Sequence, residues 1–185
     1  MRQIDGVSEA ILSGGDPLTL SNRRVGELFA RLADTSIATV RIHTRYPIMV
    51  PERVDDGLVR VLSGTRLRTV VVVHTNHANE LDASVAEALA ALRSASATLL
   101  NQSVLLRGVN DATDTLVALS ERLFACGALP YYLHLLDPVA GGAHFDVDET
   151  TAVRLIGELR ARLPGYLVPR LVREVPGQLS KTVVA

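Results

Sequence analysis

Short apolar runs alternate with longer amphipathic segments along the whole chain, and this alternation constrains the fold more than any other feature. The apolar runs occupy 10–12, 38–43, 69–74, 98–106 and 129–136, and the amphipathic segments about 22–33, 51–62, 82–94, 111–125 and 148–163. Successive runs begin about thirty residues apart, the length of one strand-plus-helix unit. Runs that are apolar on both faces indicate strands covered by helices, so the sequence predicts an α/β fold with a parallel sheet and a final extended segment at 165–175.

The length and charge of the chain describe one domain with an ordinary core. A chain of 185 residues buries roughly 70% of its unfolded surface, which is enough for a hydrophobic core. Nineteen basic residues nearly balance twenty acidic ones, so we expect neither nucleic acid nor an anionic membrane as the main partner. No apolar stretch approaches the ~20 residues of a membrane span, and the start lacks the apolar region of a signal peptide. We therefore expect a cytoplasmic protein.

The single cysteine, Cys126, limits the redox and metal chemistry of the chain. One thiol cannot form an intrachain disulfide or supply a metal site that needs several thiolates. We predict that Cys126 is a small buried apolar residue on a helix. His74 and His77 are spaced so that their rings lie on opposite faces of a strand end, and no third ligand follows at a suitable spacing. We therefore predict no metal site.

Lys181 is the only lysine among the nineteen basic residues. A guanidinium stays protonated near neutral pH and is a poor nucleophile, whereas a lysine amine can lose its proton and form a Schiff base with a carbonyl. Two interpretations remain open from composition. The lysine either survived by chance in an arginine-rich sequence or was kept for covalent chemistry.

Polar residues cluster where each predicted strand ends. The clusters are SGGD at 13–16, RIHTR at 41–45, HTNH at 74–77, NQS at 101–103 and HLLD at 134–137. The carboxyl ends of the strands form the ligand-binding face of a βα barrel, so these clusters predict a site there. Asp16 before Pro17, taken alone, is typical of a turn.

Individual side chains in these clusters suit a small polar ligand. Asn101 and Gln102 lie on an otherwise apolar strand and need partners if they are buried; we expect a ligand rather than neighbouring backbone. Asp137 and Glu174 supply negative charge. Three arginines are candidate clamps for a phosphate or a carboxylate: Arg41, Arg45 and Arg107.

From the residues alone, the chain is an α/β-barrel enzyme that uses a Schiff-base lysine on a small polar substrate. The alternative is a barrel like the phosphosugar aldolases, which place their lysine on an interior strand. Lys181 lies instead in a C-terminal segment that contains Gly and Pro, which favours a cofactor held at the face of the barrel.

Eight strings, in order from about residue 9 to the end of the chain, carry a family resemblance. They are ILSGGDPL (11–18), RIHTRYPI (41–48), HTNHANE (74–80), LLNQSVLLRGVND (99–111), PYYLHLLD (130–137), GAHF (142–145), GYLVPRLVRE (165–174) and SKT (180–182). The chain resembles the radical S-adenosylmethionine (radical SAM) aminomutases of the lysine 2,3-aminomutase type. Within that family it is most similar to the elongation factor P (R)-β-lysylation branch, as the HANE, LHLLD and VREVPG variants indicate.

The resemblance implies a partial TIM-like (βα) radical SAM barrel that lacks the first βα unit. Residues 1–163 would form this partial barrel, and residues 164–185 a C-terminal extension of the same domain that binds pyridoxal phosphate. The implied site residues are Ser13, Gly14, Gly15, Asp16, His74 and Gln102 for S-adenosylmethionine, Lys181 for covalent attachment of pyridoxal phosphate, and Asp137 and Glu174 for the side-chain ammonium of the substrate. Glu174 stands where the family usually has Asp. Two carboxylates favour lysine over glutamate as the substrate.

The implied reaction converts L-lysine into (R)-β-lysine, an isomerisation that uses a radical from S-adenosylmethionine together with pyridoxal phosphate. The protein would hold the two cofactors close together and shield the radical from water. In the elongation factor P branch, a separate lysyl ligase attaches the product to that factor. The alternative is a free-lysine 2,3-aminomutase of lysine metabolism.

The chain departs from the family at the iron–sulfur cluster. The family binds a 4Fe–4S cluster through CxxxCxxC after the first barrel strand, and this sequence contains no such motif. Without the cluster no electron reaches S-adenosylmethionine, so we expect this chain alone to be inactive. A missing first unit also exposes a strand edge near Ile11, which favours a homo-oligomer. The alternative from another class is a non-catalytic truncated remnant that binds a small molecule or a partner protein.

Overall fold

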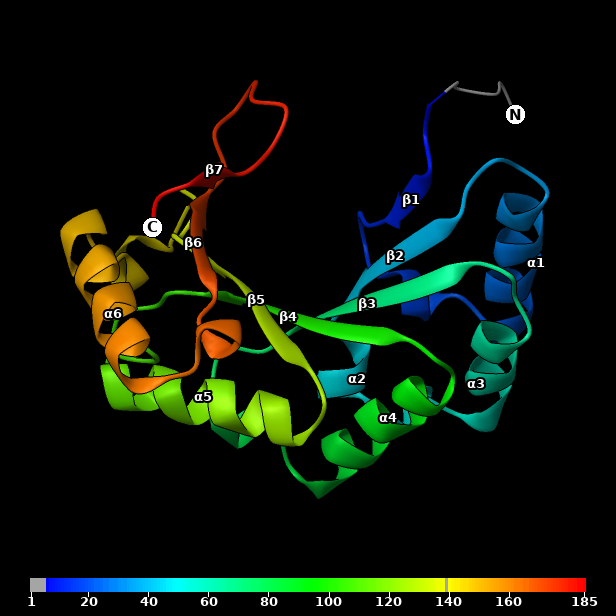
Figure 1. The fold of residues 1–185 in the computed structure, drawn as a ribbon, viewed down its shortest axis with the longest axis horizontal. Helices are drawn as coiled ribbons and strands as arrows, with labels where there is room; N and C mark the ends of the chain where they lie inside the picture. Colours follow the sequence, from blue (N-terminus) through cyan, green and yellow to red (C-terminus); the bar gives the residue numbers. More distant parts are fainter. Residues whose placement is uncertain (1–5, 139) are drawn as a thin grey trace. The chain divides into compact units, whose positions relative to one another are not determined.

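Strands and helices alternate along the computed structural model, which describes residues 6–138 and 140–185 (Figure 1). The strands are β1 (Glu9–Leu12), β2 (Thr39–Thr44), β3 (Arg68–His74), β4 (Thr98–Val104), β5 (Leu129–His134), β6 (Arg170–Arg173) and β7 (Thr182–Val183). The helices are α1 (Asn22–Ala33), α2 (Tyr46–Met49), α3 (Asp56–Ser63), α4 (Ala83–Ser94), α5 (Thr113–Ala125) and α6 (Glu149–Arg162). The strands are neighbours in the sheet in chain order, so the predicted α/β fold is confirmed. None of the described helices is long and apolar enough to cross a bilayer.

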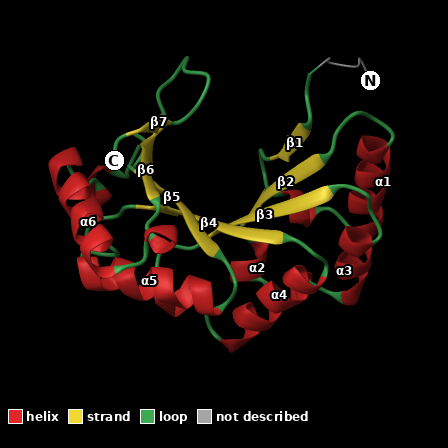
Figure 2. Cartoon of the chain, viewed as in Figure 1, coloured by secondary structure: helices red, strands yellow, loops and turns green. Residues whose placement is uncertain are grey.

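The chain forms two compact units that interleave in sequence. The first consists of residues up to 74 together with 82–100, and the second of residues 75–81 together with 101–185. β4 contributes its first three residues to the first unit and the rest to the second. In each unit the helices lie against one face of that unit's strands (Figure 2).

Parallel strands and amphipathic helices build the core of the first unit. β1 pairs with β2, and β2 with β3, both in parallel. Val40 and Ile42 of β2 are buried on the same face because side chains of a strand alternate between its two faces. On α1, Val25, Phe29 and Leu32 recur at helical spacing and are buried. The apolar spacing in the sequence therefore determines which face each element buries.

Two helices and the last strands build the core of the second unit. β5 and β6 pair in parallel, and β6 and β7 pair antiparallel. Leu155, Ile156 and Leu159 of α6 and Leu171 of β6 are at most 1% exposed and share one cluster with α5. The segment predicted as a C-terminal extension, 164–185, contributes β6 and β7 to this unit.

Cap residues explain where the helices begin. α1 spans the predicted 22–33, and Ser21 caps it by accepting a hydrogen bond from the backbone N–H of Arg24. The helix predicted at 51–62 begins later, because Pro51–Arg53 is a 3-10 turn. Asp55 caps α3 by accepting a hydrogen bond of 2.7 Å from the backbone N–H of Leu58.

Three other boundaries differ from the prediction. β4 and β5 each end two residues earlier, and the extended segment predicted at 165–175 is a 3-10 turn (Gly165–Leu167) followed by β6. β7, a two-residue strand, was too short for a sequence pattern to predict. Cys126 is buried as predicted, but it lies at the C-terminal cap of α5 rather than within the helix.

Candidate functional site

A glycine turn follows β1 in the first unit. Ser13, Gly14 and Gly15 are exposed, and the two glycines have φ angles of 87° and 69°. Only glycine adopts such angles without strain. No atom lies within 4 Å of the point where a Cβ would be at either glycine. The backbone of this turn is therefore open to a ligand.

Asp16 ties the glycine turn to the end of β2. Its carboxylate accepts hydrogen bonds from the hydroxyl of Thr44 (2.7 Å), the backbone N–H of Arg45 (2.7 Å) and the backbone N–H of Leu18 (3.0 Å). These bonds make Asp16 the cap of a 3-10 turn (Pro17–Thr19) as well as a link between two strand ends. The carboxylate therefore sets the position of the turn.

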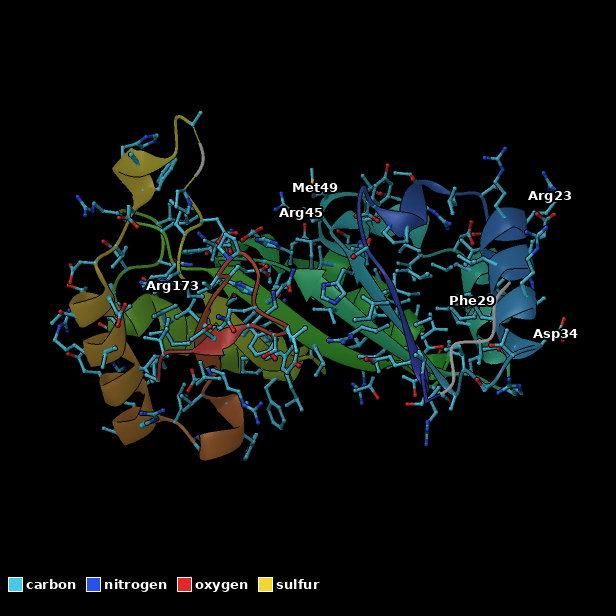
Figure 3. All side chains as sticks on the ribbon, turned by 90° about the horizontal axis from the view of Figure 1, so that it is seen from above. Arg23, Phe29, Asp34, Arg45, Met49 and Arg173 are labelled. Atoms are coloured by element: carbon cyan, nitrogen blue, oxygen red, sulfur yellow. The ribbon has the colours of Figure 1, made fainter. Side chains whose placement is uncertain are left out.

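His74, at the end of β3, lies beside the same link. Its ring nitrogen Nδ1 is 3.4 Å from Nη2 of Arg45, whose backbone is held by Asp16. Arg45 is exposed at the start of α2, near the exposed Met49 (Figure 3). The first unit thus brings the glycine turn, Asp16, Arg45 and His74 together at the ends of its strands.

The segment after His74 is structural. His77 accepts a hydrogen bond from the backbone N–H of Asn79 (3.1 Å), and Glu80 accepts two, from the backbone N–H groups of Asn76 (2.6 Å) and His77 (2.8 Å). These bonds form a capping box around a 3-10 turn (Ala78–Glu80). The HANE string therefore folds a turn in the second unit.

Asn101 does not bind a ligand, which corrects the expectation from the sequence. The side chain is 1% exposed, and its amide is satisfied by protein. It accepts from the backbone N–H of Thr75 (3.0 Å) and donates to the backbone oxygen of Thr75 (3.1 Å) and the hydroxyl of Ser103 (2.9 Å). Gln102 points to the opposite face of β4 and is only partly buried, and its amide has no hydrogen-bond partner among the described residues.

Lys181 and Glu174 meet across a hairpin in the second unit. β6 pairs with β7 so that Val172 faces Val183 and Arg173 faces Thr182, which makes Glu174 and Lys181 the next pair in register. Nζ of Lys181 donates to Oε1 of Glu174, forming an ion pair. The Lys181 side chain is 25% exposed and the Glu174 side chain 54%. Lys181 is therefore largely shielded from water.

A tight turn lies within the loop that joins β6 to β7. The backbone N–H of Gln178 donates to the backbone oxygen of Val175 (3.1 Å), and Gly177, at the third position of the turn, has a φ of 83°. Pro followed by Gly at the two central positions is typical of a type II turn. The dipeptide Pro176–Gly177 was thus the sequence feature that could have predicted the hairpin.

Aromatic and charged groups of β5 and β6 surround Lys181. Nζ of Lys181 lies 5.9 Å from the ring centroid of Tyr132, within the range of a cation–π interaction. The ring of Tyr132 contacts that of His134 edge-on at 5.8 Å. The hydrogen bond from Lys181 and then its charge lower the pKa of Glu174, with a smaller contribution from the charge of His134. Tyr132 was missed in the sequence, although it lies two residues before His134 and thus on the same strand face.

Asp137, the other predicted substrate carboxylate, lies in a loop of the second unit. It is exposed and lines a cavity of about 390 Å³ together with residues from the loop that follows. Asp146 lines the same cavity. Of the predicted arginine clamps, Arg41 is already engaged, since its Nη2 lies 2.8 Å from Oε2 of Glu9. Within 6–138 and 140–185, no group of three His, Cys, Asp or Glu side chains could hold a metal ion.

No protein-family model matches the chain, but curated proteins match it over nearly its whole length. An L-lysine 2,3-aminomutase of Haemophilus influenzae is 45% identical over 180 residues, which cover 97% of this chain and 53% of that protein. The Escherichia coli protein of the same name is 47% identical over 177 residues, which cover 95% and 52%. The Clostridium subterminale protein is 34% identical over 186 residues, which cover 100% and 44%. The chain therefore spans about half the length of the curated relatives that it matches.

Solved structures with distant sequences share the fold. A radical SAM methyltransferase from Sphaerobacter thermophilus superposes with a TM-score of 0.60 at 16% identity, over 90% of this chain and 51% of that chain. A domain of a pyruvate-formate lyase-activating enzyme from Bacteroides vulgatus gives 0.60 at 13% identity, over 90% and 98%. At these identities the likeness concerns the fold alone, and it confirms the predicted fold class, which these radical SAM proteins share. In sequence, the chain is thus similar over nearly its whole length to about half of each of these L-lysine 2,3-aminomutases, and in fold it is similar to radical SAM enzymes.

Proposed function

We propose that this chain carries the S-adenosylmethionine turn and the pyridoxal phosphate lysine of an L-lysine 2,3-aminomutase. The observation that carries the proposal is the pairing of the only lysine, Lys181, with Glu174 in a largely shielded position, in a chain 45–47% identical to two proteins of that name. The substrate would be L-lysine and the product (R)-β-lysine.

The residues present fit pyridoxal phosphate. When bound, this coenzyme holds an amino group and stabilises charge or radical character next to it. Lys181 would hold it through the side-chain nitrogen, the only lysine nitrogen in the sequence. The ring of Tyr132 lies beside that nitrogen and gives the site an aromatic wall.

The turn after β1 fits S-adenosylmethionine, which when bound and reduced supplies the radical that removes a hydrogen from the substrate. Gly14 and Gly15 leave their peptide groups open, so the turn can bind the polar end of this cofactor through its backbone. Asp16 would fix the turn through its bonds to β2. His74 would add a polar contact from the end of β3.

Glu174 and Asp137 would bind the side-chain ammonium of the substrate. Each carboxylate can accept charge-assisted hydrogen bonds from an ammonium. The Glu174 side chain is 54% exposed, and Asp137 is exposed in its loop. An acidic side chain in the same place would be repelled, so the arrangement favours lysine over glutamate.

Turnover would require groups beyond those that this sequence provides. The one cysteine, Cys126, is buried at the end of α5, so this sequence cannot supply three thiolates to a 4Fe–4S cluster. We therefore expect no turnover of L-lysine by this chain alone. The product would pass to elongation factor P through its lysyl ligase, the branch indicated by the sequence, with free lysine metabolism as the alternative. The chain would act in the cytoplasm.

A second candidate function is that of a non-catalytic protein that binds the same small molecules. The single cysteine favours it, because the chain cannot start the radical step without a cluster. The two candidates differ in what restores activity. Joining this chain to a cluster-bearing segment of a relative should give L-lysine turnover for an aminomutase part and none for a remnant that has lost its catalytic geometry.

Titration with pyridoxal phosphate tests the proposal. The chain should develop the absorption band of lysine-bound coenzyme, and Lys181→Arg should abolish it because a guanidinium does not replace the amine. With the coenzyme bound, L-lysine should raise the melting temperature and L-glutamate should not. A band that survives Lys181→Arg, or equal stabilisation by the two amino acids, would contradict the proposal.

A further inference from the structure

We propose that Glu174 is a positioning residue with two successive partners: it holds the Lys181 ammonium until pyridoxal phosphate is captured, and then receives the side-chain ammonium of the substrate. This inference rests on the proposed function. It deepens that function because it makes occupancy of the substrate site depend on occupancy of the coenzyme site.

The hairpin builds the contact between the two side chains. The register of β6 and β7 places Glu174 opposite Lys181, and the loop between them contains a tight turn at 175–178. The carboxylate binds Nζ on one side, and the ring of Tyr132 lies on another. The ammonium is therefore fixed in place before any coenzyme arrives.

The chemistry of capture requires that this pair separate. An ammonium has no lone pair, so the nitrogen must first give up a proton to solvent. It then bonds to the aldehyde carbon, and the carbonyl oxygen leaves as water. The Lys181 ammonium has three N–H donors, and after the nitrogen bonds to the aldehyde carbon it has no more than one. Glu174 consequently loses most of its hydrogen bonding to Lys181.

The released carboxylate is suited to a second ammonium. Glutamate is ionised at neutral pH, and the Glu174 side chain is 54% exposed, so an incoming cation can reach it. The interaction between a carboxylate and a cation is stronger where water is partly excluded than in bulk water. The side-chain ammonium of the substrate would then take the place of the Lys181 ammonium beside Glu174.

A neighbouring ion pair supplies a matched control. Arg173, the residue before Glu174 (Figure 3), pairs with Glu149 of α6 at 2.7 Å, with side chains 46% and 51% exposed. This pair lies in the same unit, but its cation is a guanidinium that does not capture an aldehyde. Glu149→Gln therefore removes an ion pair of similar exposure without touching Lys181.

The test measures acetylation of Lys181 by acetic anhydride, without coenzyme. Because Lys181 is the only lysine, the reagent labels it and the α-amine of the chain, and the α-amine serves as the internal standard in mass spectrometry. Glu174→Gln should speed acetylation of Lys181 about two- to fivefold, the value of a partly exposed ion pair. Glu149→Gln should not change the rate. Glu174→Asp keeps the charge and should stay within about twofold of the wild-type chain.

Three results would overturn the inference. The first is that Glu174→Gln does not speed acetylation of Lys181. The second is that Glu149→Gln speeds it equally, and the third is that Glu174→Asp speeds it as much as Glu174→Gln does. If Glu174→Gln does not fold, raising the salt concentration on the unmodified chain gives the second measurement, because screening should speed acetylation of Lys181 relative to the α-amine. If raised salt leaves the acetylation rate of Lys181 unchanged relative to that of the α-amine, the inference is overturned.

A coenzyme arm separates this inference from the proposed function. The half-saturating concentration of pyridoxal phosphate should fall about two- to fivefold in Glu174→Gln, since no pair must be broken, and stay unchanged in Glu149→Gln. A chain that acetylates as expected but takes up no coenzyme contradicts the proposed function. A chain that takes up coenzyme with equal affinity in all variants contradicts this inference.

Discussion

Asn101 and Gln102 carry the same amide on adjacent residues of β4, yet their surroundings differ completely. Asn101 is buried and bonded to Thr75 and Ser103, while Gln102 lies on the other face and has no hydrogen-bond partner among the described residues. The sequence showed only that both need partners. It could not show that Thr75, 26 positions away, presents its backbone to Asn101, because tertiary packing creates that contact.

Replacing Asn101 should therefore affect folding. Asn101→Ala leaves the backbone N–H of Thr75 without its partner in the interior and removes one of the two hydrogen bonds to the Thr75 oxygen, which Ser103 also bonds; the free energy of unfolding should fall by about 2–3 kcal/mol. Gln102→Ala should change it by less than about 0.5 kcal/mol. Urea unfolding of both variants measures the difference, and equal losses would contradict the assignment of Asn101 as structural.

Asp16 should stabilise the first unit more than an ordinary surface carboxylate does. Asp16→Ala removes a helix cap and the bonds to Thr44 and Arg45, so the free energy of unfolding should fall by about 2 kcal/mol. Asp34→Ala, at an exposed position after α1 (Figure 3), is the control and should have little effect. If the two variants unfold at the same denaturant concentration, Asp16 does not hold the turn.

At the level of elements, capping chemistry was the most reliable part of the sequence. Asp82 and Asp148, placed at predicted helix starts, both cap their helices by accepting backbone hydrogen bonds, at 2.9 Å each. The hairpin that carries Lys181 was not predicted, since β7 has only two residues and gives no alternating pattern. The sequence thus singled out Lys181 as a candidate, while it did not show the element that orients this side chain.

The cap of α3 gives a pH dependence. The pKa of Asp55 lies below its ordinary value of 3.8, mainly because its carboxylate accepts a hydrogen bond from the backbone N–H of Leu58. A carboxyl with a lowered folded-state pKa stabilises the fold above its unfolded pKa and loses that contribution as the pH falls through the folded value. The free energy of unfolding should therefore fall as the pH drops below about 4, and fall less in Asp55→Asn, which keeps a cap without a charge. Parallel pH curves for the two proteins would refute this.

For the molecule as a whole, the order of βα units was predictable and the division into two units was not. Each unit buries its own apolar cluster, and the interleaving of residues 75–81 with the second unit depends on contacts that no local pattern encodes. The fold persists in solved structures at 13–16% identity. The periodicity of apolar residues in this sequence was enough to predict the fold class.

The end of the sheet at β1 should promote self-association. Among the described residues, β1 has β2 as its only strand partner, and Ile11 is 51% exposed there. An unpaired strand edge is a template for another chain, and a charge on it opposes pairing. Ile11→Arg should weaken dimerisation at least about tenfold in sedimentation equilibrium. Met49→Arg, on the exposed surface of α2, should leave it unchanged; a wild-type chain that stays monomeric at all concentrations would contradict the prediction.

The account depends above all on covalent capture of pyridoxal phosphate by the nitrogen of Lys181. Borohydride reduction of the coenzyme-treated chain, followed by peptide mapping in a mass spectrometer, measures this directly because the sequence offers one lysine. The account predicts a single phosphopyridoxyl group on the peptide that contains Lys181. Label confined to the α-amine, or absent from every peptide, would contradict it.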